Sequence, residues 1–330
     1  MKILITGGAG FIGGHLASDL ASKNISIDLV DNMSRGIEDP FLANLKKMKN
    51  VRFLPMDILD QKEFNKLDND YNIIFHLAAI IGVRHVLERP YMVLEQNTIM
   101  TTNLIRFAQH QNKLERFLFA STSEVTAGSL KFLDIPVPTP ESIPLALTEL
   151  DSPRTSYMLS KIYGEALCIH SGLPYTIFRP HNVYGPRMGM VHVIPELLKK
   201  ALDTPADGKL KVASPEHRRA FCHVHDATKQ LVALAKTDAA LNGTFNIGNQ
   251  ETECSIRELA GLILKITNRN DLDIEALPET SGSPPRRCPD MSHTSNITGF
   301  TPAICLEEGV KNTFEWYNTN VFSTNGISAI

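Results

Sequence analysis

Short apolar runs and longer amphipathic segments alternate along the first half of the chain. The run Lys2–Thr6 precedes a segment from Phe11 to about Lys23 whose apolar residues recur at helical spacing. Further strands are expected at Ile25–Val30, Val51–Leu54, Asn72–His76, Arg116–Phe119 and Tyr175–Arg179. Strands that are apolar throughout and separated by helices are typical of a parallel sheet covered on both faces. The pattern predicts an α/β fold with a doubly wound parallel sheet.

The character of the sequence changes after Phe119. A Pro-rich stretch from Gly128 to Pro153 is expected to be a long surface excursion. Beyond it the elements become shorter and mixed, with segments expected at Thr155–Ser171 (helix), Ile194–Leu202 (helix), Phe221–Val224 (strand) and Asp226–Lys236 (helix). We therefore predict a sheet domain over residues 1–180, to which parts of 220–250 return, and a smaller, discontinuous C-terminal lobe, mainly 181–330.

Composition narrows the class of protein. The 330 residues are 43% hydrophobic and carry a formal net charge of -3, so no basic surplus favours nucleic acid as a partner. The longest apolar stretch, 72–83, contains His76 and is too short to span a bilayer, and no signal peptide is apparent. Five widely spaced cysteines form no CxxC pair. These features predict a cytoplasmic protein that binds neither membrane nor nucleic acid.

A glycine-rich turn joins the first strand to the first helix. Gly8 to Gly13 reads GxGxxG, and Gly7, Gly10 and Gly13 form a second, overlapping pattern. Between a strand and a helix, such a loop lets a pyrophosphate approach the free N–H groups of the helix. Asp31 ends the second strand, where a carboxylate accepts from a ribose hydroxyl and repels a 2′-phosphate. The sequence predicts a Rossmann-type domain that binds NAD rather than NADP, although Arg35 nearby weakens that preference.

Tyr157 and Lys161 are the candidate catalytic pair. They are four residues apart, on one face of an expected helix. A lysine ammonium and the positive nicotinamide both favour the phenolate, so Tyr157 is suited to take a proton from a substrate hydroxyl. The segment 120–125 follows a strand at the carboxyl edge of the sheet, where such folds bind ligands, and its Thr122 is expected to hold that hydroxyl.

At these residues the sequence resembles the extended short-chain dehydrogenase/reductases that modify nucleotide sugars, the NAD-dependent epimerase/dehydratase family. The resemblance runs along nearly the whole chain. It rests on TGGAGFIG (6–13), Asp31-Asn32, Asp57-Ile58, HLAA (76–79), Asn97, STSEV (121–125), YMLSK (157–161), RPHNVYGPR (179–187), RRAFCHVHD (218–226), NIGN (246–249) and RRCPD (286–290).

The resemblance implies roles for individual residues. Those expected to contact the cofactor, besides the glycines and Asp31, are Phe11, Ile12, Asn32, Asp57, Ile58, Ala78, Ala79, Asn97, Tyr157 and Lys161. Those expected to contact the nucleotide sugar are Ser123, Arg154, Asn182, His192, Arg219 and Arg287, the last two as a clamp on the diphosphate. Arg154 is the candidate to face a substrate carboxylate.

The family also implies a common first step, in which C4 of the sugar is oxidised to a ketone. Glu124 then favours a lyase outcome, either decarboxylation of a uronate or elimination of water, because a simple epimerisation needs no carboxylate at this position. The alternative is a 4-epimerase that returns the hydride to the other face. Thr126-Ala127 stands where the family usually has Tyr-Gly. Because this changes the pocket wall beside the sugar, the resemblance does not identify which sugar is bound.

Three further expectations concern cofactor, assembly and rival classes. NAD is expected to stay tightly bound and to be recycled within one turnover, and the helices 91–110 and 155–171 are expected to form a four-helix bundle in a homodimer. A non-catalytic NAD(P)-binding sensor or subunit is opposed by the intact Tyr157 and Lys161. A metal site is not expected, because the histidines between 217 and 225 lack the HExxH spacing.

Overall fold

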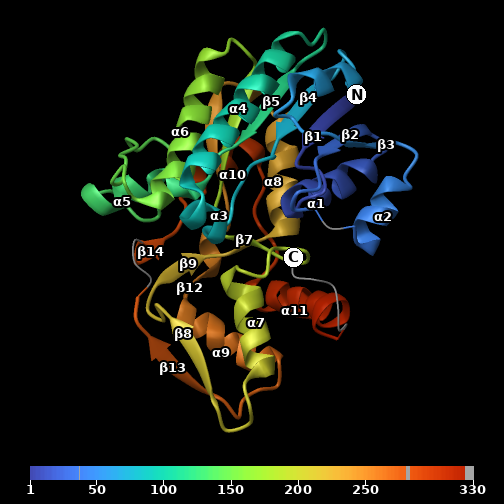
Figure 1. Ribbon diagram of the computed structural model, residues 1–330. Helices are drawn as coiled ribbons and strands as arrows, with labels where there is room; N and C mark the ends of the chain where they lie inside the picture. The colour runs from blue at the N-terminus through green and yellow to red at the C-terminus, as the bar shows by residue number, and fades with distance from the viewer. Residues whose placement is uncertain (37, 280–282, 324–330) are drawn as a thin grey trace.

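A seven-stranded parallel sheet forms the centre of the molecule (Figure 1). The computed structural model describes residues 1–36, 38–279 and 283–323. The strand order is β11-β6-β5-β4-β1-β2-β3, and the predicted doubly wound parallel sheet is confirmed. Its strands are β1 (Lys2–Thr6), β2 (Ser26–Asp31), β3 (Val51–Pro55), β4 (Ile73–His76), β5 (Arg116–Ala120), β6 (Tyr175–Pro180) and β11 (Gly243–Ile247).

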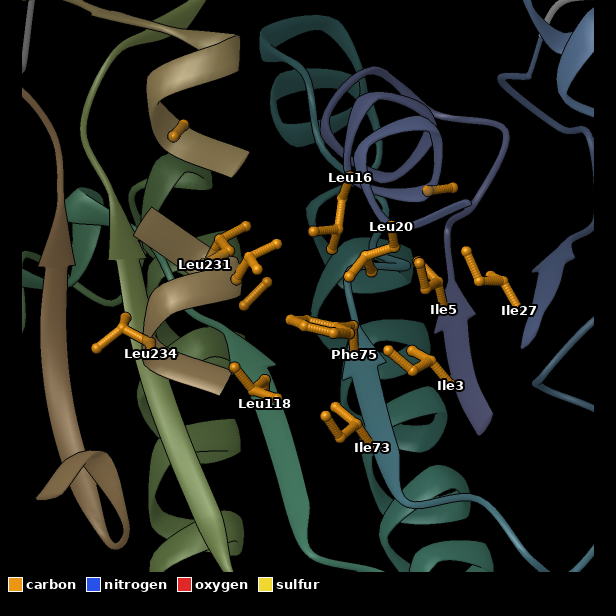
Figure 2. Close-up of a cluster of buried hydrophobic side chains, with 14 of the residues drawn as sticks. Ile3, Ile5, Leu16, Leu20, Ile27, Ile73, Phe75, Leu118, Leu231 and Leu234 are labelled. Atoms are coloured by element: carbon orange, nitrogen blue, oxygen red, sulfur yellow. The ribbon is translucent and has the colours of Figure 1, made fainter. Parts of the chain in front are cut away.

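Helices cover both faces of this sheet because alternate residues of each strand point to opposite sides. Ile3 and Ile5 of β1 pack with Leu16 of α1 (Phe11–Ala21) and Leu231 of α8 (Val224–Lys236) in one core cluster, which Figure 2 shows in close-up. Leu4, between those two isoleucines, faces the other way. It joins a second cluster with residues of α4 (Pro90–Gln109) and α6 (Pro153–His170).

A smaller lobe lies below the sheet in Figure 1 and has a core of its own, to which Tyr184, Leu198, Phe221, Leu259 and Val310 contribute. Its elements are β7 (Val183–Tyr184), α7 (Val193–Asp203), β8 (Lys209–Ala213), β9 (Arg218–Ala220), β10 (Cys222–His223), β12 (Glu253–Ser255), α9 (Ile256–Ile266), β13 (Asp273–Leu277), β14 (Arg286–Arg287) and α11 (Leu306–Tyr317). Strand β9 pairs with both β12 and β14. This pairing places Arg219 and Arg287, which are far apart in the sequence, next to each other on neighbouring strands.

The remaining elements are short: α2 (Pro40–Lys46), η1 (Gln61–Lys66), α3 (Val83–Glu88), η2 (Ser123–Thr126), α5 (Ala127–Phe132), η3 (Asp238–Ala240), η4 (Gln250–Thr252), α10 (Ser292–Thr298) and η5 (Asn318–Phe322). None of the helices in the described part of the chain is both long enough and apolar enough to cross a membrane.

The structure corrects two expectations about local structure. The strand expected at 221–224 is only Cys222–His223, because the His223 side chain accepts the backbone N–H of His225 and α8 begins at Val224. The Pro-rich excursion begins with a short helix, α5, instead of a loop. Gly128 makes this helix fit, since a Cβ there would lie 2.0 Å from the carbonyl oxygen of Ala146.

A buried ion pair joins the two lobes beside the glycine-rich turn. Arg187 donates from Nε to Asp39 at 2.6 Å, and both side chains are less than a tenth exposed. Its Nη2 also lies 3.3 Å from the carbonyl oxygen of Ala9. One arginine of the smaller lobe therefore holds both the start of α2 and the backbone of the turn.

Candidate active site

The glycine-rich turn between β1 and α1, residues 7–10, is called the glycine loop below. Gly7 has φ +72, and its N–H donates to the carbonyl oxygen of Val30 at 2.8 Å. A Cβ on Gly7 would lie 2.8 Å from the backbone nitrogen of Ala78, and one on Gly13 would lie 2.2 Å from the Gly7 oxygen. Larger residues would therefore close the loop. No side chain caps the start of α1, so its first N–H groups are free to face a phosphate, as an NAD site requires.

Asp31 connects the end of β2 to the glycine loop. Its carboxylate accepts the N–H of Ala9 at 3.1 Å and the N–H of Met33 at 2.8 Å. Burial raises the pKa of this carboxyl, against the effect of those hydrogen bonds. The position fits the predicted role, because a carboxylate at the end of the second strand can accept from an adenosine ribose.

The cofactor residues expected after β2 and β3, which are Asn32, Asp57 and Ile58, divide into two kinds. Asn32 donates to Asp57 at 3.1 Å and joins the loops that follow β2 and β3. Ile58 is only 4% exposed and packs in the core, so its backbone rather than its side chain is left to border a ligand.

The segment after β4 contains Ala78 and Ala79, both half-buried. The side chain of Asn97 in α4 forms two hydrogen bonds with the backbone of Ile80. It accepts from the N–H at 2.7 Å and donates to the carbonyl oxygen at 3.0 Å. Asn97 is 3% exposed. Its contribution to a cofactor site would therefore come through the shape of this segment.

Phe11 and Ile12 occupy the first turn of α1, as expected. Phe11 packs against the core of the smaller lobe, whereas Ile12 packs against the sheet core. The side chains thus anchor the helix start between the two lobes, and the backbone of this turn is what a phosphate would meet.

Lys161 is buried in α6 beside the carboxyl end of β5. Its Nζ donates to the carbonyl oxygen of Ala120 at 2.8 Å and lies 5.9 Å from the ring centre of Tyr157. Burial lowers the pKa of Lys161 to about 8. The helix thus places the ammonium within one turn of the phenol, as the spacing predicts.

Tyr157 faces Thr122, and burial together with three neighbouring groups sets the pKa of its phenol. Burial and then the negative charge of Glu124 raise its pKa, whereas a hydrogen bond from Thr122 and the charge of Arg35 lower it. The sequence assigned the lowering to Lys161. The net effect in the structure is a raised pKa of Tyr157, and the cation that partly offsets this rise is Arg35, from the loop after β2, and not Lys161.

Glu124 lies among three arginines. Its Oε1 accepts from Nη1 of Arg287 at 2.6 Å. The charge of Arg287 holds the pKa of Glu124 below its usual value, and the charges of Arg154 and Arg219 act in the same direction. Glu124 is therefore brought together with Arg154, the candidate to face a substrate carboxylate, and with the two arginines expected to clamp the diphosphate. Ser123, by contrast, is 4% exposed, so its side chain is buried.

Arg219 and Arg287 stand side by side, because β9 and β14 pair in parallel with these two residues in register. Burial, and then the charge of Arg287, lowers the pKa of Arg219 to about 10. Arg219 already donates to the Pro284 carbonyl and to the Ser283 hydroxyl, both at 2.7 Å. Two neighbouring buried cations favour an anionic ligand.

The other two expected substrate residues lie elsewhere. Asn182, at φ 38, donates to the carbonyl oxygen of Ala220 at 2.9 Å and so braces the smaller lobe. His192 precedes α7, and burial followed by the charge of Arg35 lowers its pKa. The charge that acts on His192 therefore comes from Arg35, in the loop after β2, and not from Glu124.

Sequence reasoning missed a buried network behind the catalytic pair. Arg179 forms a two-pronged ion pair with Glu165, at 2.8 and 2.7 Å, and Glu165 also accepts from Ser121. This network ties α6 to β6 and to the segment that carries Thr122. Two features of the sequence could have indicated this network: the arginine that begins the RPHNVYGPR motif, and the glutamate four residues after Lys161.

Among the described residues, no group of three or more His, Cys, Asp or Glu side chains is arranged to hold a metal ion.

Comparisons with known proteins agree with this arrangement. Residues 3–248 match the model of the NAD dependent epimerase/dehydratase family. The chain is 32% identical over 328 residues to the UDP-N-acetyl-alpha-D-glucosaminuronate decarboxylase of Bacillus cytotoxicus, covering 96% of this chain and 97% of the relative. It is 29% identical over 326 residues to UDP-glucuronic acid decarboxylase 1 of Xenopus tropicalis, covering 96% of this chain and 72% of that protein.

Solved structures give the same picture. A UDP-glucose 4-epimerase from Thermotoga maritima, with UDP-glucose, superposes with a TM-score of 0.82 at 26% identity, covering 97% of this chain and 99% of that one. A UDP-glucuronic acid 4-epimerase from Bacillus cereus, in complex with a fluorinated UDP-glucuronic acid and NAD, gives 0.80 at 26% identity with the same coverage. With a family match over residues 3–248 and a relative that is 32% identical over nearly the whole of both chains, the chain belongs to the NAD dependent epimerase/dehydratase family.

Proposed function

We propose that this enzyme oxidises a nucleotide-linked uronic acid at C4 and releases its C6 carboxyl group as carbon dioxide. The observation that carries the proposal is the set of charges around Glu124, where Arg154, Arg219 and Arg287 all act on one carboxylate. Two decarboxylases that act on UDP-linked uronic acids are among its relatives, one of them at 32% identity.

The charges of the site fit such a substrate. A diphosphate linked to a uronate carries about three negative charges near neutral pH, two on the phosphates and one at C6. Arg219 and Arg287, adjacent in β9 and β14, suit the paired phosphate oxygens. Arg154, in the first turn of α6 three residues before Tyr157, remains for the carboxylate next to the reacting carbon. A neutral hexose would leave that third cation without a partner.

The reaction then follows from the positions of the side chains. Thr122 and Tyr157 hold the C4 hydroxyl between them, and Tyr157 takes its proton. NAD, when bound, supplies the acceptor for the hydride from C4 and later returns it. The ketone at C4 makes the C6 carboxylate a β-keto acid, so the C5–C6 bond breaks, carbon dioxide leaves, and the enolate is protonated at C5.

Glu124 would assist the second step. Its carboxylate stays ionised because Arg287 holds its pKa low. A fixed negative charge near C6 disfavours the substrate carboxylate, and this repulsion disappears as neutral carbon dioxide forms. Because the hydride is returned within the cycle, NAD is neither consumed nor released, and we propose that it stays tightly bound.

The test is to incubate the purified protein with UDP-glucuronate, its 2-acetamido analogue, UDP-glucose, UDP-GlcNAc and GDP-mannose. Products are identified by mass spectrometry and proton NMR. We expect the two uronates to lose carbon dioxide and the three neutral sugars to remain unchanged. An unchanged mass with inversion at C4 would identify an epimerase, and loss of water would identify a dehydratase; either result would overturn the proposal. Binding of NAD without any product would favour the non-catalytic sensor.

We also propose a homodimer in which α4 and α6 of two copies form a four-helix bundle. These helices pack on one another and expose large apolar side chains on their outer face, including Tyr91 (75%), Ile99 (40%) and Tyr163 (46%). Ile99→Glu is expected to convert a dimer into a monomer in sedimentation velocity, because it places charge in a desolvated interface. Leu241→Glu, at an exposed apolar residue outside these helices, is the control and should stay dimeric. A wild-type protein that sediments as a monomer would contradict the dimer.

Two coarser proposals complete the picture. We divide the chain functionally into a cofactor domain, 1–180 with parts of 220–250, and a substrate lobe formed mainly by the rest; residues 280–282 and 324–330 of that lobe lie outside the described part. We place the enzyme in the cytoplasm, where its cysteines, free thiols in this structure, stay reduced.

A further inference from the structure

One face of α6 holds three consecutive residues, 120–122, at the carboxyl end of β5. The contacts are hydrogen bonds, and they join Tyr157 to Thr122, Lys161 to Ala120 and Glu165 to Ser121. The three residues of α6 follow each other at intervals of four, so they lie in one row along the helix. Two members of the row are the candidate catalytic pair, and the third is a glutamate to which no role has been given.

Glu165 is fixed from a second strand. Arg179, in β6, donates to both of its carboxylate oxygens, from Nε at 2.8 Å and from Nη2 at 2.7 Å. Both side chains are buried, with exposed fractions of 5% and 6%. Arg179 also donates to the backbone carbonyl oxygen of Glu141 at 3.1 Å, so the guanidinium is itself held in place. The carboxylate therefore has a fixed position behind the catalytic pair.

This position puts the carboxylate one helical turn from the ammonium of Lys161, because residues four apart are neighbours on a helix. Burial lowers the pKa of Lys161 to about 8, and Cys168 and Glu165 act in the opposite direction. The two groups differ in charge at neutral pH, which decides between them.

The other titratable groups that face Lys161 are uncharged near neutral pH. Burial raises the pKa of the Cys168 thiol, so this thiol keeps its proton. Burial, and then the charge of Lys161, lowers the pKa of His76 in β4 to about 3, so the imidazole is neutral. Burial also raises the pKa of the Tyr157 phenol. Glu165 therefore supplies the negative charge that keeps the ammonium protonated.

We infer that Glu165 is a positioning residue for the catalytic pair, which holds residues 120–122 against α6 and supplies the counter-charge of the Lys161 ammonium. The inference rests on the proposed function only in taking Tyr157 and Lys161 as the catalytic pair, and it depends neither on the sugar nor on the release of carbon dioxide. Without this charge Lys161 loses its proton at a lower pH. A neutral amine no longer favours the phenolate, so activity is lost from the alkaline side.

The experiment follows the proton of Lys161 directly, by NMR titration of NAD-saturated protein that carries ¹³C at the lysine Cε. The signal of Lys161 is assigned with Lys161→Met. We expect the titration midpoint of Lys161 to fall by about one pH unit in Glu165→Gln, because the amide keeps the shape and loses the charge. Glu165→Asp keeps the charge and should recover most of this shift.

The pH profile of turnover is the second measurement, made with the best substrate of the panel. We expect the alkaline limb of Glu165→Gln to begin about one pH unit below that of the wild type, in step with the NMR midpoint. Loss of stability alone would lower the profile as a whole and would not move this limb.

Asp39→Asn is the matched control, because it breaks a second buried ion pair, that of Asp39 with Arg187, whose charges do not act on Lys161. Its Lys161 midpoint should equal that of the wild type. Should Glu165→Gln not fold, since it leaves the Arg179 guanidinium buried without its partner, the double variant Glu165→Gln/Arg179→Met removes both charges and should show the same direction of shift.

A Lys161 midpoint that stays at the wild-type value in the folded variant, or that falls equally in Asp39→Asn, would overturn the inference. Neither result would alter which sugars of the panel react. Conversely, a failure to release carbon dioxide would leave the NMR titration unchanged, so the two proposals fail separately.

Discussion

Replacing Tyr157 with Phe is expected to lower turnover by about 10²- to 10⁴-fold while dinucleotide affinity stays within about twofold of the wild type. The variant loses only the hydroxyl that takes the proton from the C4 oxygen, and the ring, its packing and Lys161 remain. In this structure Thr122 faces that hydroxyl, and Arg35 favours its phenolate. Without a proton acceptor at this place, C4 is not oxidised, and every later step depends on the ketone.

The measurement is single-turnover kinetics with the best substrate of the panel, together with titration of NAD. Tyr163→Phe, which removes an exposed phenol from the same helix, is the control and should keep wild-type turnover. A Tyr157→Phe enzyme that turns over at a rate near the wild type would show that another group takes the proton. A large loss of NAD affinity would instead show that the hydroxyl acts mainly in binding the cofactor.

Glu124→Gln is expected to slow the release of carbon dioxide by about 10²-fold or more and to leave the first oxidation much less affected. The amide has nearly the same shape but no charge, so it ends the repulsion of the C6 carboxylate. The 4-keto uronate should then accumulate, seen as a mass two hydrogens below that of the substrate.

Because Arg287 holds the pKa of Glu124 low, the carboxylate is charged throughout the neutral range. The defect of Glu124→Gln should therefore be the same at each pH between about 6 and 8, a range that lies wholly above the reference pKa of a glutamate, about 4.3. Glu149→Gln, at an exposed carboxylate that pairs with Lys131, is the control. Unchanged release of carbon dioxide, with no accumulation of the ketone, would remove Glu124 from the mechanism.

The sequence by itself determined the sheet and the cofactor loop. The strand expected at Lys2–Thr6 is β1 with those bounds, and the strands expected at 116–119 and 175–179 end one residue later than predicted. Such elements follow from local patterns, since a run of apolar residues buries both faces of a strand wherever it lies in a parallel sheet. The glycine loop could be predicted for the same reason. Its glycines are required by close contacts with residues a few positions away and with the adjoining strands. Tyr157 and Lys161 share a helix, so their proximity needs only the helical repeat.

Contacts between distant segments were decided by the tertiary structure alone. Arg287, which is expected to bind the diphosphate, also pairs with Glu124, 163 residues earlier in the chain. The side chain of Ile58, a residue expected to contact the cofactor, is buried in the core, and Asn182 holds the backbone of its own lobe. Local spacing predicts which residues share a strand or a helix, whereas the partner of a long charged side chain depends on how those elements pack, because its reach exceeds the distance between neighbouring strands.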